Sequence, residues 1–182
     1  LVKLNFFNKA SSDFFVSDKL EKSLFLKTTN RLDTATQSGS SIMLENLVRG
    51  FYYFGENADL DLLDGALKNS WAGVMKNPTS SIGYMAAAYT KLCGYQFVVL
   101  IKNDLFGKEV KNYLLKLSSF SILIFFYDEK NIPKNTTIGN KGCVNGGSTV
   151  YVCSGFVCSA PIIGIKGMKE WVNKNMALKI ND

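Results

Sequence analysis

The sequence predicts a mixed α/β protein in which helices come first and a small α/β portion follows. Two observations lead to this prediction. Apolar residues recur at spacings of three and four over residues 43–93, which is the period of amphipathic helices. After Tyr95 they instead form two continuous runs, "YQFVVLI" and "SILIFFY", with the length and composition of buried strands. The chain is therefore expected to divide into residues 1–94 and residues 95–182.

Three helices are expected in the first portion, after a segment that reads as extended and loop structure. Ser40 and Ser41 offer an N-cap for the first helix, and Asn57 offers one for the second. The spacing places one set of residues on the inward face of the second helix: Leu60, Leu63, Leu67, Trp71 and Val74. A third helix follows Pro78 in "SSIGYMAAAYTKLCG". Because the connections are short, the helices are expected to pack as antiparallel neighbours.

The second portion is expected to contain a βαβ unit. A strand at 95–101 is followed by a helix that Asp104 can cap and by a strand within 119–128. Such units are normally parallel and right-handed. "TVYVC" at 149–153 predicts a third strand. A closing helix is expected from about Gly167 to Leu178, with Met168, Trp171, Val172 and Met176 facing inward.

The composition of the chain excludes several classes of protein. With no histidine among 182 residues, neither a Ser-His-Asp nor a Cys-His reaction centre can be built, nor a zinc site that contains histidine. The chain has 21 basic and 15 acidic residues, and the basic residues are mostly scattered along it rather than clustered. Nucleic acid is therefore not an expected partner. No apolar run approaches the ~20 residues of a membrane span. A soluble, cytoplasmic protein without a cofactor is therefore expected.

The four cysteines do not form a metal-binding pattern. Cys93 and Cys143 are solitary, whereas Cys153 and Cys158 are close together in "YVCSGFVCSAP". A four-cysteine zinc site needs two close pairs, so no metal is expected. A turn at Ser154-Gly155 makes a local disulfide between Cys153 and Cys158 geometrically feasible. A redox pair and two buried small residues that end a strand are the alternatives.

The loop "RLDTATQSGSS" is the main candidate for ligand binding. It concentrates a carboxylate, an amide and hydroxyls directly before a helix; the candidate ligand-binding residues are Asp33, Thr36, Gln37, Ser38 and Ser40. Such residues can bind sugar hydroxyls or an anion. They can equally cap the helix and satisfy its first amides, and both alternatives stay open.

Two stretches in the chain resemble the C-terminal part of the YyaL-type family, whose animal members are called spermatogenesis-associated, thioredoxin-like proteins. They are "DTATQSGSS" at 33–41 and "YVCSGFVCSAP" at 151–161, which contains the pattern Tyr-Val-Cys-x-x-Phe-x-Cys-x-x-Pro. The order of helices and strands between them agrees with that family, and the resemblance covers roughly residues 13–165.

The resemblance implies an architecture and a function. Members of the family carry a thioredoxin-like domain followed by an α/α toroid similar to six-hairpin glycosidases. This chain would supply helical hairpins of the toroid and the small α/β portion that follows, with the loop at 33–41 facing the toroid's cavity. The implied function is binding or modification of a carbohydrate; a non-enzymatic structural or protein-interaction module is the alternative. Whether the chain is an enzyme stays open. Association with the remainder of a parent chain, or with a second copy, is also expected.

Overall fold

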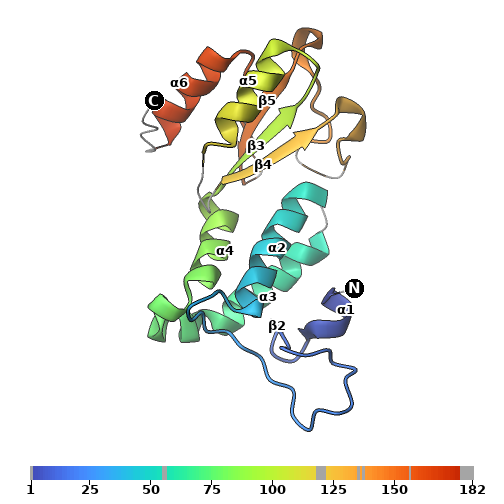
Figure 1. Cartoon of the computed structure of the whole chain (residues 1–182), viewed down its shortest axis with the longest axis vertical. Coiled ribbons are helices and arrows are strands. Elements are labelled where there is room, and N and C mark those ends of the chain that lie inside the picture. Colours follow the sequence, from blue (N-terminus) through green and yellow to red (C-terminus); the bar gives the residue numbers. More distant parts are fainter. Residues whose placement is uncertain are drawn as a thin grey trace. The chain divides into compact units, whose positions relative to one another are not determined.

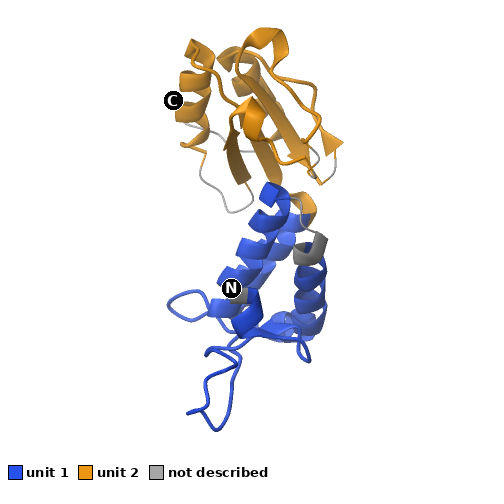
Figure 2. Ribbon diagram, turned by 90° about the vertical axis from the view of Figure 1, so that its right-hand side faces the viewer, with its two compact units in different colours: residues 1–91 blue, residues 92–182 orange. Residues whose placement is uncertain are grey.

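The computed structural model describes residues 2–54, 57–117, 122–134, 136, 138–155 and 157–176. The chain forms two compact units, Leu1–Lys91 and Leu92–Asp182 (Figure 2). The first is mainly helical and the second combines helices with a sheet, so the expectation of a mixed α/β protein is confirmed. In the part of the chain that the structure describes, no helix has the length and apolar character needed to cross a membrane.

The first unit begins with two small elements that the sequence pattern did not predict. Helix α1 (Val2–Phe6) leads into a hairpin of β1 (Phe7–Asn8) and β2 (Asp13–Phe14). Phe7 lies opposite Phe14 across this hairpin, and their rings meet edge to face at 5.3 Å between centroids. These elements are too short to give a periodic pattern, which explains why residues 1–41 read as extended and loop structure.

The three expected helices are present. Helix α2 (Gly39–Phe54) and α3 (Asn57–Lys76) pack against each other, and a short 3-10 turn, η1 (Pro78–Ser80), leads into α4 (Ile82–Cys93) (Figure 1). Leu44, Leu47 and Val48 of α2 are buried. Gly83 allows α4 to approach α2 closely, because a Cβ placed there would lie 2.5 Å from the Cβ of Ser41.

One inward-facing residue was predicted wrongly. Trp71 was grouped with Leu63 and Val74 on one face of α3, but its side chain is 51% exposed whereas Leu63 and Val74 are buried. At 3.6 residues per turn, two steps of four turn Trp71 about 80° away from Leu63. Ser70 lies within about 20° of Leu63 on the same geometry, and it is the residue that is buried.

The second unit is built on a four-stranded sheet in the order β4-β3-β5-β6. Its elements are β3 (Tyr95–Leu100), α5 (Leu105–Leu114), β4 (Ile122–Tyr127), η2 (Glu129–Asn131), η3 (Val144–Gly146), β5 (Thr149–Ser154), β6 (Val157–Cys158) and α6 (Ile165–Asn175). Strands β3 and β4 are parallel and α5 connects them, which confirms the βαβ unit. Strand β5 runs antiparallel to β3 and turns back into β6.

Helices α5 and α6 cover one face of this sheet (Figure 1). Alternate residues of β3 and β5 point into the same buried cluster as the inner residues of both helices: Phe97, Val99, Val110, Leu114, Val150, Val152, Met168 and Val172. Trp171 packs edge to face against Tyr95 and Phe97. The side chain of Asp104 accepts a hydrogen bond of 2.7 Å from the Gly107 amide, so the predicted cap of α5 is confirmed. Helix α6 begins at Ile165 rather than Gly167, and Leu178 lies outside the described residues.

Candidate functional site

The Asp33 carboxylate forms hydrogen bonds with the beginnings of two helices, α2 and α4. One carboxylate oxygen accepts hydrogen bonds from the Ser38 amide at 2.8 Å and the Ser41 hydroxyl at 2.7 Å, next to the start of α2. The other accepts a hydrogen bond of 2.7 Å from the Gly83 amide in the first turn of α4. Both helix ends carry unsatisfied amides and a partial positive charge, which a carboxylate stabilises. In this structure Asp33 is therefore a buried helix-capping residue.

The surroundings of Asp33 keep its carboxyl group ionised. Burial is the largest single influence and acts to raise the pKa. Hydrogen bonds from the Ser38 and Gly83 amides and from the two serine hydroxyls act in the opposite direction, and together they lower the pKa below its ordinary value. A carboxyl group with a lowered pKa, already bonded to these donors, is poorly suited to donate a proton in catalysis.

The other residues of the predicted ligand-binding loop do not gather around one site, and each has its own contacts. Ser38, and not Ser40 or Ser41, is the N-cap of α2, because its hydroxyl accepts a hydrogen bond of 3.2 Å from the Ser41 amide. The predicted cap is thus wrong by two to three residues. Gln37 is exposed and donates to Glu45 at 2.7 Å. Thr36 is exposed, and its backbone carbonyl accepts from the Thr34 amide.

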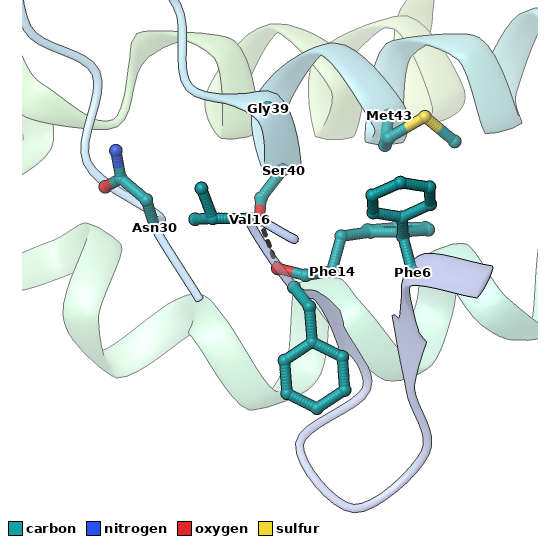
Figure 3. Close-up of a pocket in the computed structure, with 8 residues that line it drawn as sticks. Phe6, Phe14, Val16, Asn30, Gly39, Ser40 and Met43 are labelled. Atoms are coloured by element: carbon teal, nitrogen blue, oxygen red, sulfur yellow. Dashed lines mark hydrogen bonds between the residues drawn. The ribbon is translucent and has the colours of Figure 1, made fainter. Parts of the chain in front are cut away.

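Ser40 lies in a pocket with several phenylalanines (Figure 3). We call this the aromatic pocket; its volume is about 370 Å³, and it is lined by Phe6, Phe14, Phe15, Val16, Asn30, Gly39, Ser40 and Met43. The Ser40 hydroxyl donates a long hydrogen bond of 3.5 Å to the Phe14 carbonyl oxygen. The pocket thus combines aromatic rings with one hydroxyl and one amide side chain. Ser40 is the one predicted ligand residue that lines it.

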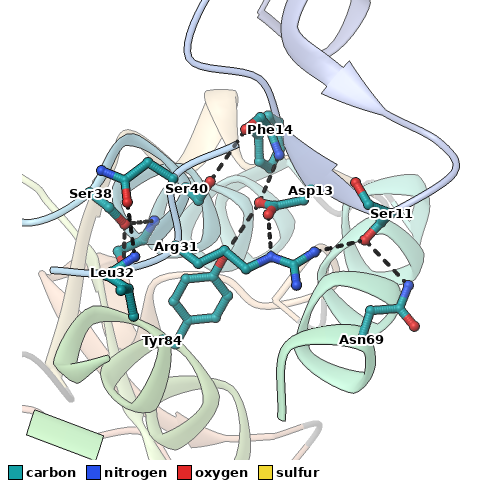
Figure 4. Close-up of polar contacts among 11 residues, drawn as sticks. Ser11, Asp13, Phe14, Arg31, Leu32, Ser38, Ser40, Asn69 and Tyr84 are labelled. Carbon is teal, nitrogen blue, oxygen red and sulfur yellow. Dashed lines mark hydrogen bonds and ion pairs between the residues drawn. The ribbon is translucent and has the colours of Figure 1, made fainter. Parts of the chain in front are cut away.

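A second buried carboxylate, Asp13, was not predicted as part of a site. Its side chain is 1% exposed, forms an ion pair with Arg31 and accepts hydrogen bonds from the Phe14 amide at 2.7 Å and the Tyr84 hydroxyl at 3.3 Å (Figure 4). Burial, followed by the negative charge of Asp13, raises the pKa of Tyr84 to about 12. Because Asp13 and Tyr84 are 71 positions apart, no local spacing connects them. An Asp within an apolar "DFF" stretch was the only sequence signal.

The Arg31 side chain also borders a cavity of about 420 Å³, which we call the polar cavity. Segment 29–32, the last turns of α3 and the start of α4 enclose it; its lining residues are Thr29, Asn30, Arg31, Leu32, Ser70, Gly73, Val74, Asn77, Ser81 and Tyr84. Most of these side chains are polar and uncharged. Asn30 lines the polar cavity and the aromatic pocket alike.

In the second unit, polar residues gather at the carboxyl ends of β3 and β4. Lys102 and Glu129 form an ion pair at 2.8 Å, and Glu129 also accepts from the Cys143 amide at 2.8 Å. Both hydrogen bonds lower the pKa of Glu129, and the one from Lys102 has the larger effect. Burial and then the charge of Glu129 raise the pKa of the Cys143 thiol. Because a raised pKa disfavours the thiolate, Cys143 is a poor nucleophile. The main role of these contacts is to hold the loop before β5 in place.

Cys153 and Cys158 are joined by a disulfide in the structure. They lie opposite each other on β5 and β6, with Cα atoms 3.9 Å apart, so the bond closes the hairpin at the edge of the sheet. Gly155 occupies the turn with φ = 58°, a conformation that favours glycine. Cys153 is fully buried and Cys158 is half-buried. Cys93 and Cys143 are free thiols.

The described residues show no ready-made metal site, and their two most buried carboxylates already have partners. They contain no group of three or more cysteine, aspartate or glutamate side chains placed to hold a metal ion. Asp13 and Asp33 are both occupied by internal partners. The two cavities of the first unit are concave and partly polar, as small-molecule sites generally are. No protein-family model matches this chain, and no curated protein matches it either.

Proposed function

We propose that the helical unit binds a carbohydrate and that the chain is the C-terminal portion of a protein of the YyaL type. The aromatic pocket carries the proposal. Its phenylalanine rings offer apolar faces for the C–H side of a sugar ring, and Ser40 and Asn30 offer hydrogen bonds for hydroxyl groups. Ser40 belongs to the loop at 33–41 that the resemblance assigns to ligand binding.

The positions and partners of the buried carboxylates favour sugar binding over sugar hydrolysis. Glycoside cleavage uses a pair of carboxyl groups that flank the scissile bond. Asp33 caps two helices and Asp13 is paired with Arg31, while none of the described residues that line the aromatic pocket carries a carboxylate. A hydrolytic role would therefore need acidic residues from outside this pocket.

The arrangement of α2, α3 and α4 supports the toroid part of the proposal. Two packed helices and a third that follows after a short connection are the building pattern of α/α hairpins. In the proposed parent protein, further hairpins complete the toroid. The unit formed by β3 to α6 then follows the toroid.

Titration with monosaccharides tests the proposal. Glucose, galactose and N-acetylglucosamine are added to ¹⁵N-labelled protein, and at least one is expected to shift the amide signals of Asn30 and Ser40 with a Kd near ~1 mM. Gly39→Leu should abolish the shifts, because Gly39 lines the aromatic pocket and a Cβ there meets no atom within 4 Å. Gly73→Leu, an equally open helical glycine outside this pocket, is the matched control. Absence of binding, or binding that Gly39→Leu leaves intact, contradicts the proposal.

Exposed apolar residues on α3 and α4 favour a second candidate function, an interaction module. Trp71 and Met75 on α3 are 51% and 64% exposed, and Ile82 and Met85 on α4 are 59% and 38% exposed. Large apolar side chains on neighbouring turns mark surfaces that contact another protein. The partner we propose is another amphipathic helix of the parent chain.

Sedimentation velocity tests this second candidate. With its natural partner helix absent, the isolated chain should self-associate through these residues at tens of micromolar. Met85→Glu should shift it towards the monomer, whereas Lys76→Glu, an exposed change on α3, should not. A chain that stays monomeric at every concentration contradicts the interaction module and leaves the carbohydrate proposal unaffected.

A further inference from the structure

The wall of the polar cavity contains a buried hydroxyl group without a partner. Ser70 is 3% exposed and lines the cavity, and its hydroxyl has no hydrogen-bond partner among the described residues. It lies near the Tyr84 phenol, whose pKa is raised by burial and by Asp13, a rise that Ser70 opposes, but the two oxygens do not reach hydrogen-bond geometry. A buried hydroxyl without a partner costs free energy unless water or a ligand supplies one.

The charge of the polar cavity selects a neutral ligand. Among the described residues of its lining, Arg31 is the charged one, and the ion pair with Asp13 already neutralises it. The remaining polar groups are amides and hydroxyls, including Asn77, whose side chain does not cap the 3-10 turn that it precedes. Groups of this kind exchange hydrogen bonds with the hydroxyls of a polyol and offer no net charge to an anion.

Asn30 lines both the polar cavity and the aromatic pocket. Its side-chain oxygen accepts a hydrogen bond of 3.1 Å from the Leu32 amide, which fixes the side chain and leaves its NH₂ group able to donate. Because the residue lines both spaces, a molecule longer than one sugar ring can contact Asn30 from either side. The volumes of about 370 and 420 Å³ are each within the range of small-ligand sites.

We propose that the aromatic pocket and the polar cavity are adjoining subsites for a neutral disaccharide. One ring packs on the phenylalanines of the aromatic pocket, and the hydroxyls of the next ring bind Asn77 in the polar cavity. Asn30 donates a hydrogen bond near the linkage between them. This inference rests on the proposed carbohydrate binding and adds the length of the ligand and a second set of contacts.

Calorimetry with glucose, maltose and cellobiose tests the two subsites with a matched pair of variants. Of these two spaces, Gly39 lines the aromatic pocket and Gly73 the polar cavity, and at both positions a Cβ meets no atom within 4 Å. One of the disaccharides should bind the unaltered protein at least tenfold more tightly than glucose. Gly73→Leu should lower the affinity for that disaccharide to the level of glucose and leave the affinity for glucose unchanged. Gly39→Leu should lower the affinity for both sugars.

A second variant distinguishes a loss of disaccharide binding from a loss of folding. Asn77→Ala removes an exposed amide from the polar cavity, so it should keep the melting temperature and still weaken the disaccharide alone by about threefold or more. Equal affinities for glucose and both disaccharides, unchanged by Gly73→Leu and Asn77→Ala, overturn the two subsites and leave the proposed function standing. If no sugar binds the unaltered protein, the proposed function itself fails, and this inference fails with it.

Discussion

The carboxylate of Asp33 accepts a hydrogen bond of 2.7 Å from the backbone amide of Gly83, 50 positions further along the chain. The same carboxylate holds Ser38 and Ser41 at the start of α2. One buried side chain thereby fixes the beginning of α4 next to the beginning of α2. The loop at 33–41 owes its shape to this contact, and so does the position of Ser40 in the aromatic pocket.

Replacing Asp33 with alanine should destabilise the protein by about 3 kcal/mol, because several buried donors lose their charged acceptor at once. Urea denaturation followed by circular dichroism measures the loss. Asp61→Asn, a change of an exposed carboxylate in α3, should alter the free energy of unfolding by less than about 0.5 kcal/mol. A similar, small effect of both substitutions would contradict the capping role of Asp33.

The contribution of Asp33 should depend on pH in the acid range. Its pKa in the folded protein is lower than the ordinary value of 3.8, so the ionised form is favoured by folding. The stabilisation is therefore fully present above pH 3.8 and is lost as the pH falls through the lower, folded-state pKa. The difference in unfolding free energy between the unaltered protein and Asp33→Ala, measured from pH 6 to pH 2, should shrink. A difference that is constant with pH would show that the charge of Asp33 is not the stabilising feature.

Gly83→Ala should be destabilising although alanine favours helices. The added methyl group would lie 2.5 Å from the Ser41 Cβ, so α2 and α4 would have to move apart, at a cost of about 1 to 3 kcal/mol. Gly73→Ala is the matched control in α3, where the methyl group meets no atom within 4 Å and should stabilise by up to about 1 kcal/mol. Thermal denaturation of the two variants should give shifts of opposite sign, and shifts of the same sign would refute the close contact.

The sequence predicted the parts of this fold that depend on neighbouring residues. Continuous apolar runs located β3 and β4, and Asp104 caps α5 through the amide of Gly107, only three residues away. The contact between Asp33 and Gly83 could not be predicted in this way, because it depends on how two helices pack. For the same reason the choice between capping and ligand binding at Asp33 stayed open. The polar cavity was missed because its walls come from three separate segments.

The disulfide between Cys153 and Cys158 should stabilise the second unit by about 2 kcal/mol, since it closes a short loop in the unfolded chain. Reduction should therefore lower the melting temperature and increase hydrogen exchange at β6, the edge strand, before it affects β3. The double variant Cys153→Ala with Cys158→Ala should behave as the reduced protein does and should not respond to reductant.

A count of thiols checks the pairing directly. Protein purified without reductant and then unfolded should react with Ellman's reagent at two thiols, those of Cys93 and Cys143, and at four after reduction. Four reactive thiols before reduction would mean that the pair is present as a dithiol, which is the state expected of most cysteine pairs in a reducing compartment. In that case the loss of stability on reduction should vanish as well, and the hairpin of β5 and β6 would depend on its backbone hydrogen bonds and on the buried Cys153 side chain.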